Sequence, residues 1–331
     1  MIHEETLVTP QKQKEALEEE CFDLVIIGAG PAGMSAALCA GRSDLKTLLI
    51  ERTLPGGQTS TAYLVDNYLG FPKGLLGEEL GKKMEDHLFN YSIQYARENV
   101  LDVEKIGMKE TIVKTDMGSS YKTKALLIAI GLEPKTLDAP FETKYLGRGI
   151  SYYAQCDANF YRGMDVAVIG GGNCACYAAE YLSSYVNTLY LIHRSDSIKA
   201  VKSLKQRVLN NPKIEVMWNS EVVDVFGIDK IEKIKIHNIQ THQHTWLNSK
   251  GLFVYTGRIP PREKFLDTLS QDEKGFIITD EYMRTSIPGI YAAGDIRCKQ
   301  IRQIATAVSD GMIAAINIER DLSRNSFPIK L

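Results

Sequence analysis

The stretch that decides the fold is Gly28-Ala29-Gly30-Pro31-Ala32-Gly33, which directly follows the run Phe22-Asp23-Leu24-Val25-Ile26-Ile27. A short run rich in β-branched apolar residues is typical of a strand that is buried on both faces. After the glycine turn, the small residues from Met34 to Ala40 predict a helix, and Thr47-Leu48-Leu49-Ile50 predicts a second strand. A strand, a tight turn, a helix and a second strand in this order make a βαβ unit.

The three glycines of this turn have separate physical tasks. Gly28 makes the tight turn, Gly30 lets the backbone approach a diphosphate, and Gly33 lets the helix pack on the strand. The N-terminus of the following helix would face the diphosphate. Glu51 stands at the end of the second strand, about 20 residues on, where its carboxylate can accept hydrogen bonds from a ribose diol. This context favours a dinucleotide site over an empty turn.

The same order of elements recurs about 140 residues further along the chain. The apolar segments 165–169 and 188–192 predict strands, and residues 173–185 between them predict a helix. Gly170-Gly171-Gly172 forms the turn between the first of these strands and the helix, so a second βαβ unit is predicted. Two such units suggest two nucleotide-binding domains rather than one enlarged sheet.

The second glycine turn has the same spacing of small residues as the first, with Ala175 in the third small position. His193-Arg194 stands at the end of the second strand of this unit, where an NAD site would usually place Asp or Glu. A cation at that place suits the 2′-phosphate of NADP. Dinucleotide binding is therefore favoured over an empty turn, and the kind of dinucleotide stays open.

At 331 residues the chain is longer than one ordinary core needs, so two domains are expected. The apolar strands 125–130 and 251–257 close the two halves, and a strand and turn at 290–295 return the chain to the first domain. Proline-marked linkers at 132–140 and 258–262 separate the domains. We therefore predict an α/β fold with two Rossmann-like three-layer dinucleotide-binding domains, the second inserted into the first. The predicted bounds are 1–20 for a flexible N-terminal arm, 21–132 with 260–331 for the first domain, and 133–259 for the inserted domain.

Bulk composition argues against two classes of partner. The formal net charge is -2, which gives no strong field to attract nucleic acid or an anionic membrane. Residues 1–20 are polar and lack the pattern of a signal peptide, and no uncharged apolar run approaches the roughly 18 residues of a membrane-spanning helix. We therefore expect a cytoplasmic protein whose six cysteines are thiols or redox groups rather than structural disulfides.

Several further motifs follow one another along the chain after residue 21. They are Gly56-Gly57-Gln58, Asn67 with Gly70-Phe71-Pro72, Gly149-Ile150-Ser151-Tyr152, Cys156-Asp157, Phe160-Tyr161-Arg162-Gly163, the second glycine turn, Thr285-Ser286-Ile287-Pro288-Gly289, Ala292-Ala293-Gly294-Asp295 and Arg302-Gln303. In this order they resemble the motifs of the low-molecular-weight thioredoxin reductases, along nearly the whole chain. The resemblance implies a homodimer with one FAD per subunit, bound by the first domain. It also implies an inserted domain that rotates to bring a nicotinamide and a Cys-x-x-Cys pair to the flavin in turn.

The resemblance assigns one group of residues to FAD. Asp295 would bind the ribityl chain, and Gln303 and Asn67 would lie near the isoalloxazine ring. The predicted FAD-binding residues are Gly28, Gly30, Pro31, Ala32, Gly33, Glu51, Arg52, Gly57, Gln58, Asn67, Gly294, Asp295, Arg302 and Gln303.

The sequence departs from the family pattern at the redox-active disulfide. The family has Cys-Ala-Thr-Cys-Asp where this chain has Tyr153-Ala154-Gln155-Cys156-Asp157. The family's substrate-attacking cysteine is therefore Tyr153 here, while the resemblance keeps Cys156 as the flavin-facing thiol and Asp157 as the adjacent acid/base. Because a second thiol must resolve a mixed disulfide, one cysteine cannot cycle through a local disulfide. Ordinary thioredoxin reduction at this motif is not expected.

The nicotinamide side departs from the family pattern as well. The family's phosphate clamp reads His-Arg-Arg with an Arg four residues later, and this chain has His193-Arg194-Ser195 and Lys199. At Ser195 a planar guanidinium that binds phosphate through two hydrogen bonds is lost, and at Lys199 another is replaced by an ammonium point charge. The thinner clamp predicts weak NADPH binding, NADH, electron delivery by ferredoxin, or a second FAD in this domain. The predicted residues of this second dinucleotide site are Gly170, Gly172, Asn173, Cys174, Ala175, His193, Arg194 and Lys199.

Three cysteines are candidate redox groups. Cys156 is interpreted as a flavin-contacting thiol, with a small buried apolar residue as the alternative. Cys174 and Cys176 lie at the start of the second dinucleotide helix, a place that favours thiol reactivity, although packing in the core is the favoured alternative. We hypothesise that Cys156 pairs with one of these two cysteines in some redox state.

We therefore expect an FAD-dependent oxidoreductase of the disulfide-reductase type, with Cys156 and Asp157 as its catalytic residues. The expected redox partner is a thioredoxin-like protein or a ferredoxin. No metal site is predicted, because His237, His242 and His244 lie in a polar hairpin tip. Two alternatives stay open: an NAD(P)H-dependent flavin reductase or oxidase without a thiol step, and a non-catalytic flavin-binding redox sensor.

Overall fold

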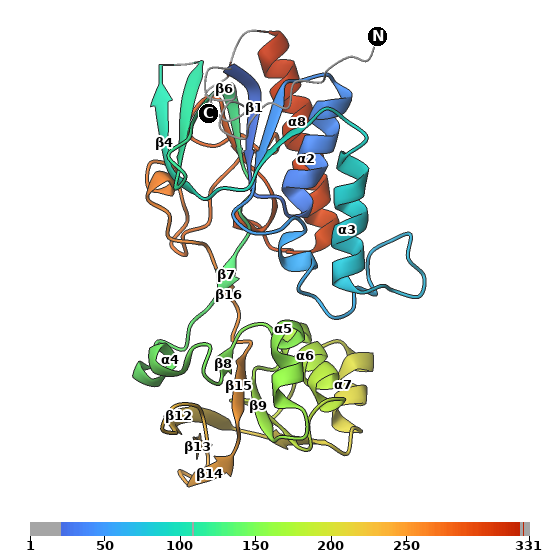
Figure 1. Ribbon diagram of the computed structural model, residues 1–331, viewed down its shortest axis with the longest axis vertical. Helices are drawn as coiled ribbons and strands as arrows, with labels where there is room; N and C mark the ends of the chain where they lie inside the picture. The colour runs from blue at the N-terminus through green and yellow to red at the C-terminus, as the bar shows by residue number, and fades with distance from the viewer. Residues whose placement is uncertain (1–20, 108, 325–326, 328–331) are drawn as a thin grey trace, which may run out of the picture. The chain divides into compact units, whose positions relative to one another are not determined.

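The computed structural model describes residues 21–107, 109–324 and 327, so the arm predicted at 1–20 lies outside the described residues. The chain forms two compact units, and Figure 1 labels many of their helices and strands. Of the described residues, unit 1 comprises those up to Ser60, those of Asp66–Leu132 and those from Pro260 onward; unit 2 comprises Thr61–Val65 and Glu133–Ile259. The short segment Thr61–Val65 groups with unit 2, although the sequence alone places it in the first domain.

Unit 1 is built on parallel strands in the order β3-β2-β1-β6, and β17 also pairs with β6 in parallel. Ile26 of β1 lies opposite Leu49 of β2 on one side and opposite Leu127 of β6 on the other. β1 is thus central, and its apolar residues are buried on both faces. The elements of unit 1 are β1 (Cys21–Ile27), α2 (Pro31–Arg42), β2 (Thr47–Ile50), α3 (Gly77–Leu88), β3 (Gln94–Ala96), β4 (Val100–Ile106), β5 (Glu110–Thr115), β6 (Ser120–Ile128), β17 (Ile290–Ala292) and α8 (Ile304–Ser323).

The two faces of this sheet are covered by different layers. Successive side chains of a strand point to opposite faces. Ile26 belongs to the apolar cluster that includes Ala314 of α8, whereas Val25 belongs to the cluster that includes Val113 of β5. α2, α3 and α8 lie together on one side of the sheet in Figure 1, and β4, β5 and β6 form an antiparallel meander. Unit 1 therefore has three layers, with a β-meander in place of helices in one outer layer.

Small residues let α2 and α8 pack closely, side by side (Figure 1). A Cβ at Gly311 of α8 would overlap the Ala32 carbonyl oxygen of α2. The Ser35 hydroxyl donates a hydrogen bond to the Val308 carbonyl oxygen at 2.8 Å. This contact fastens the last helix of the chain to the first βαβ unit.

Unit 2 repeats this plan around a parallel sheet with the strand order β11-β10-β9-β15-β8. α6 and α7 pack against one face, and the antiparallel strands β12, β13 and β14 pack against the other. The elements of unit 2 are β7 (Glu133–Pro134), α4 (Pro140–Tyr145), β8 (Ile150–Ser151), α5 (Ala154–Asp157), β9 (Val166–Ile169), α6 (Asn173–Ser183), β10 (Leu189–Ile192), α7 (Lys202–Leu209), β11 (Ile214–Met217), β12 (Ser220–Phe226), β13 (Lys233–Asn238), β14 (His244–Asn248), β15 (Gly251–Val254) and β16 (Arg258–Ile259).

The two segments interpreted as separate linkers pair with each other. β7 and β16 form an antiparallel ribbon in which Ile259 lies opposite Glu133. Pro134 has no amide hydrogen to donate, and the neighbouring Lys135 amide donates to the Gly257 carbonyl oxygen at 3.0 Å. Proline therefore shortens the pairing without preventing it. None of the helices in the described part of the chain combines the length and the apolar character that crossing a bilayer requires.

Candidate functional site

The first glycine turn leads from β1 into α2 at the carboxyl edge of the unit 1 sheet. Gly28 has a φ of 102°, and a Cβ there would lie 2.5 Å from the Ala129 carbonyl oxygen. A Cβ at Gly33 would overlap the Gly28 carbonyl oxygen. Both positions require glycine, because a side chain would collide with backbone that cannot move aside.

Gly30 differs from these two glycines, since a Cβ there would meet nothing within 4 Å. It precedes Pro31, the first residue of α2, and no side chain of the described residues caps this helix end. Proline at the first helical position needs no N–H partner. The amides that follow carry the positive end of the helix dipole. The open cradle at Gly30 therefore fits the diphosphate of a dinucleotide.

Glu51, directly after β2, is held against this turn. Its Oε2 accepts a hydrogen bond from the Ala29 amide at 2.8 Å, and its Oε1 accepts from the amide and the hydroxyl of Thr53, both at 2.9 Å. The carboxylate is buried, and its fixed oxygens keep lone pairs for a ribose diol. Arg52 follows it and is exposed.

The loop Gly56-Gly57-Gln58 closes over the same turn. The Gly56 amide donates to the Ala29 carbonyl oxygen at 2.8 Å, and a Cβ at Gly57 would lie 3.1 Å from the Gly30 Cα. The Gln58 side-chain amide donates to the Leu132 carbonyl oxygen at 2.9 Å. Gly57 thus stands beside the place where a diphosphate would approach.

Gly294-Asp295 comes from the C-terminal part of the chain to the same edge of unit 1. The Ala293 amide donates to the Ile128 carbonyl oxygen at 3.0 Å, which continues the pairing of β17 with β6. Gly294 has a φ of 79°, and a Cβ there would lie 2.9 Å from the Ala32 Cβ in the first turn of α2. The Gly294 amide donates to Asp310 of α8 at 3.1 Å. This motif and the first glycine turn therefore belong to one site.

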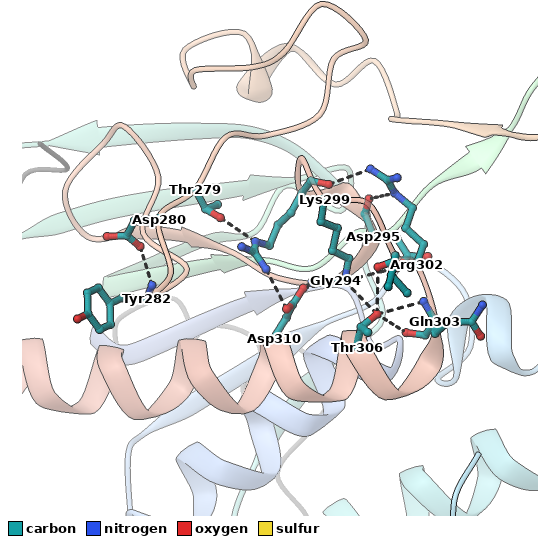
Figure 2. Close-up of polar contacts among 12 residues, drawn as sticks. Thr279, Asp280, Tyr282, Gly294, Asp295, Lys299, Arg302, Gln303, Thr306 and Asp310 are labelled. Carbon is teal, nitrogen blue, oxygen red and sulfur yellow. Dashed lines mark hydrogen bonds and ion pairs between the residues drawn. The ribbon is translucent and has the colours of Figure 1, made fainter. Parts of the chain in front are cut away.

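Asp310 is the centre of a charge cluster that the sequence analysis missed. Figure 2 shows its side chain rising from α8 toward the loop that carries Asp295 and Lys299. Asp310 pairs with Arg297 and with Lys299, each at 2.8 Å, and the Lys299 Nζ also lies 3.9 Å from Asp295 Oδ1. The cluster fixes the loop that carries Asp295. The signal in the sequence was a carboxylate among the small and apolar residues of the buried face of α8, which also holds Asn317 and Asp321.

Arg302, Gln303 and Asn67 come together beside this loop. Arg302 donates to the backbone carbonyl oxygens of Asp295 and Arg297 at 3.1 and 3.0 Å, so it braces the loop (Figure 2). Gln303 caps α8 in a reciprocal capping box with Thr306. The Gln303 Oε1 also accepts a hydrogen bond from Asn67 at 2.9 Å, although the two residues are 236 positions apart.

The second glycine turn, between β9 and α6, has a similar geometry. Gly170 has a φ of 142°, and a Cβ there would lie 2.6 Å from the Tyr255 carbonyl oxygen. A Cβ at Gly172 would meet nothing within 4 Å, as at the first turn. Asn173 begins α6, and its side-chain oxygen accepts a hydrogen bond from the Val201 amide at 2.9 Å. This turn also has room for a diphosphate.

His193 lies over the second turn, where a Cβ at Gly171 would overlap its ring. Its Nε2 lies 2.8 Å from the Ser195 hydroxyl and 3.0 Å from the Ser197 carbonyl oxygen. Burial lowers the pKa of the imidazole, and two neighbouring cations lower it further. The ring therefore packs over the turn, and the cation of the His193-Arg194 pair is the exposed Arg194.

Arg194 and Lys199 are the remaining cations of the predicted phosphate clamp, and both are exposed. The Lys199 amide donates to the Gly171 carbonyl oxygen at 2.8 Å, so the loop folds back onto the turn. Ala175, the third small residue of the turn, lies in α6 and is buried.

The altered disulfide motif forms α5 and the residues that precede it. The Tyr153 amide donates to the Ser151 hydroxyl at 2.9 Å, and the Ala154 amide donates to the Tyr255 hydroxyl at 3.1 Å. Cys156 is exposed and Asp157 is partly exposed. The exposure of Cys156 argues against the alternative in which it is a buried apolar residue.

Cys174 and Cys176 have different surroundings, although both lie in the first turn of α6. Cys174 is exposed. Cys176 is fully buried among the apolar residues beneath α6, and burial raises the pKa of its thiol to about 11. Cys176 is therefore suited to packing, and Cys174 is the accessible thiol of the two.

No group of three or more His, Cys, Asp or Glu side chains within residues 21–107, 109–324 and 327 is arranged to hold a metal ion. The rings of His242 and His244 instead each stack with the ring of His237, near the hairpin that joins β13 to β14.

Comparisons with known proteins agree on one family. The model of the family described as pyridine nucleotide-disulphide oxidoreductase matches residues 22–311. A thioredoxin reductase of Listeria innocua is 39% identical over 306 residues, which cover 92% of this chain and 95% of that protein. The crystal structure of Lactococcus lactis thioredoxin reductase has 39% identity and a TM-score of 0.87, and the match covers 92% of this chain and 99% of that one.

A more distant structure, the ferredoxin-flavin thioredoxin reductase of Clostridium acetobutylicum, has 29% identity and a TM-score of 0.51, with 92% of this chain and 99% of that one covered. This chain therefore belongs to the pyridine nucleotide-disulphide oxidoreductase family and is a thioredoxin reductase-like, FAD-dependent oxidoreductase.

Proposed function

We propose that the protein is a disulfide oxidoreductase that uses a single cysteine, Cys156, at the family's dithiol position, and that NADPH is not its efficient electron donor. The observation that carries this proposal is the replacement of the family's first active-site cysteine by Tyr153, three residues before an exposed Cys156. By resemblance to the family, we also propose a cytoplasmic homodimer that acts on a thioredoxin-like protein disulfide.

The residues of unit 1 support FAD as the resident cofactor. FAD, when bound, supplies the two-electron redox chemistry that passes reducing equivalents to the thiol. Gly30 and Gly57 would leave room for its diphosphate, and Glu51 would accept hydrogen bonds from its ribose. The loop of Asp295, fixed by Asp310, would hold the middle of the cofactor.

Cys156 is the thiol that exchanges with a substrate disulfide. Its exposure lets a protein disulfide reach the sulfur, and the thiolate is the attacking form. Asp157, the next residue of α5, takes the thiol proton and returns it to the leaving sulfur. Because position 153 holds a tyrosine, this motif contains no thiol that resolves the mixed disulfide.

The altered phosphate clamp supports a donor other than NADPH. The His193 ring packs on the turn, and the Ser195 hydroxyl lies 2.8 Å from its Nε2. The two cations that remain are exposed, and exposed ion pairs contribute about 1 kcal/mol or less. We infer that a ferredoxin-like protein delivers the electrons, and the name of the Clostridium acetobutylicum relative supports testing that class of donor first.

The alternative is that unit 2 binds a second FAD on the turn at 170–172, which would take part in electron transfer. The Gly172 position is as open as Gly30, and FAD has no 2′-phosphate to clamp. The FAD content of the purified protein separates these two possibilities, because only a second bound flavin raises it to about two per chain.

Flavin reduction and disulfide turnover together test the proposed function. Under anaerobic conditions, reduced ferredoxin should bleach the flavin faster than NADPH does. Cys156→Ser should still be bleached but should lose disulfide turnover, whereas Cys21→Ser, which changes an exposed cysteine of β1, should keep it. Full turnover by Cys156→Ser would instead favour the alternative of a flavin reductase without a thiol step.

A further inference from the structure

The unit 2 sheet brings two exposed cysteines to one edge. Phe253 of β15 lies opposite Ser151 of β8 on one side and opposite Val168 of β9 on the other. The three strands are parallel, so they end at the same edge, with β8 and β9 separated by one strand, or about 10 Å. The chain that leaves β8 forms α5 with Cys156, and the chain that leaves β9 begins α6 with Cys174.

Tyr255, directly after β15, joins the two cysteine-bearing segments. Its hydroxyl accepts the hydrogen bond from the Ala154 amide of α5, and its carbonyl oxygen faces Gly170 before α6. Burial raises the pKa of Tyr255 to about 12, and the thiols of Cys174 and Cys156 both add to the shift. Tyr255 therefore contacts both segments, one through its hydroxyl and the other through its carbonyl oxygen.

The helices that carry the two thiols also pack on each other. Ala154 and Ala158, at the two ends of α5, share an apolar cluster with Ala175 and Ala179 of α6. Cys176 is buried in the same cluster, whereas Cys156 and Cys174 stay on the accessible side. Of the two cysteines of α6, only Cys174 is open to an incoming sulfur.

We propose that Cys174 is the resolving thiol for Cys156, a role that rests on the proposed function of Cys156. Cys156 attacks a substrate disulfide, whose S–S bond breaks as the Cys156–substrate bond forms, and the first substrate sulfur leaves with the Cys156 proton. Cys174 then attacks the Cys156 sulfur, and the second substrate sulfur leaves with the Cys174 proton. The substrate gains the two electrons that the two protein thiols lose, so no further oxidant is needed. The FAD that unit 1 would hold, once reduced by the proposed donor, would supply the two electrons and two protons that restore both thiols.

Peptide mapping after exposure to a small disulfide tests this pair. The purified FAD-containing protein is treated with 2-hydroxyethyl disulfide, its remaining thiols are alkylated, and it is digested with trypsin. Cleavage after Arg148, Arg162 and Arg194 places Cys156 in peptide 149–162 and Cys174 in peptide 163–194. We expect a disulfide-linked pair of these peptides in the wild type and in Cys176→Ala. In Cys174→Ser the pair should be lost, and Cys156 should accumulate a mixed disulfide with 2-mercaptoethanol.

Two results would overturn the assignment. One is recovery of Cys174 as an alkylated thiol in the oxidised wild type, and the other is a linked pair that survives in Cys174→Ser but not in Cys176→Ala. A failure of the proposed function has a different signature, because Cys156→Ser would then keep full disulfide turnover. Loss of turnover in Cys156→Ser together with alkylated Cys174 in the wild type would rule out the resolving role of Cys174 and would leave the proposed function of Cys156 in place.

Discussion

Among single residues, Gly30 and Gly33 of the first turn have opposite surroundings. A Cβ meets nothing within 4 Å at Gly30 but overlaps a backbone oxygen at Gly33. Gly30→Ala should change the free energy of unfolding of the apoprotein by about 0.5 kcal/mol or less. Its FAD affinity should fall, because the methyl group stands where the diphosphate approaches. Gly33→Ala should lose about 1–3 kcal/mol of stability. Thermal unfolding and FAD titration check both, and undiminished FAD affinity in Gly30→Ala would refute the diphosphate position.

His193 should give the protein a pH dependence in the acidic range. Burial lowers the pKa of its imidazole below the ordinary value of about 6.5. Folding favours the neutral form, so this contribution to stability is present above about pH 6.5 and is lost as the pH falls through the lowered pKa. Between about pH 7.5 and about pH 5.5, the thermal midpoint of the wild type should fall more steeply than that of His193→Asn. Parallel profiles would show that the imidazole is not held neutral.

The phosphate clamp can be rebuilt by two substitutions. Ser195→Arg combined with Lys199→Arg restores two planar guanidinium groups at the family's positions. The Kd for NADPH should fall roughly tenfold or more, since a hydrogen bond to a charged group contributes about 1.5–3 kcal/mol. The Kd for NADH, which has no 2′-phosphate, serves as the control and should stay the same. A wild type that already binds NADPH much more tightly than NADH would contradict the weakened clamp.

At the scale of elements, α8 is fastened to the sheet of unit 1 by a buried carboxylate. Asp321 accepts hydrogen bonds from the Arg284 guanidinium at 2.9 and 3.0 Å and from the Tyr291 hydroxyl at 2.6 Å. Its side chain is 1% exposed, so Asp321→Asn leaves Arg284 without its buried counter-ion. We expect this change to cost about 3–5 kcal/mol of stability.

Asp267→Asn is the matched control for this carboxylate, because Asp267 is exposed. It should change the free energy of unfolding by about 0.5 kcal/mol or less. Denaturant unfolding of the two variants separates the buried position from the exposed one. Equal stabilities would show that the Arg284–Asp321 pair does not hold α8.

The sequence could predict both βαβ units because their signals are local. An apolar strand, a glycine turn and a helix of small residues follow one another directly, and β2 spans the four residues expected. The pairing of β7 with β16 could not be predicted, since it joins segments more than a hundred residues apart. The grouping of Thr61–Val65 with unit 2 also left no local signal.

The candidate site was predictable to the same extent as the fold. The spacing of Gly28, Gly30 and Gly33 predicts a tight turn, an open position and a close helix–strand contact. In the structure Gly28 has a φ of 102°, Gly30 is open, and a Cβ at Gly33 would overlap backbone. The cluster of Asp310 with Lys299 was missed because its members lie on a helix and on the loop before it, and pair only after folding. The burial that separates Cys174 from Cys176 depends likewise on how α6 packs.

For the whole molecule, each unit carries one open glycine position at the start of a helix, Gly30 in unit 1 and Gly172 in unit 2. Unit 1 adds a buried Glu51 and the fixed loop of Asp295 to this position. Unit 2 adds the His193 ring, packed over the turn, and the exposed cations Arg194 and Lys199. The two turns are therefore alike, and their surroundings are not.

The FAD content of the purified protein tests the cofactor site of unit 1 most directly. The protein is purified under mild conditions, and the released cofactor is identified by mass analysis. We predict a yellow protein with at least about one FAD per chain. This flavin should be lost in Gly30→Ala and retained in Gly172→Ala, which alters the equivalent open position of unit 2. Colourless protein that takes up no added FAD, or flavin that stays bound in Gly30→Ala and leaves in Gly172→Ala, would contradict it.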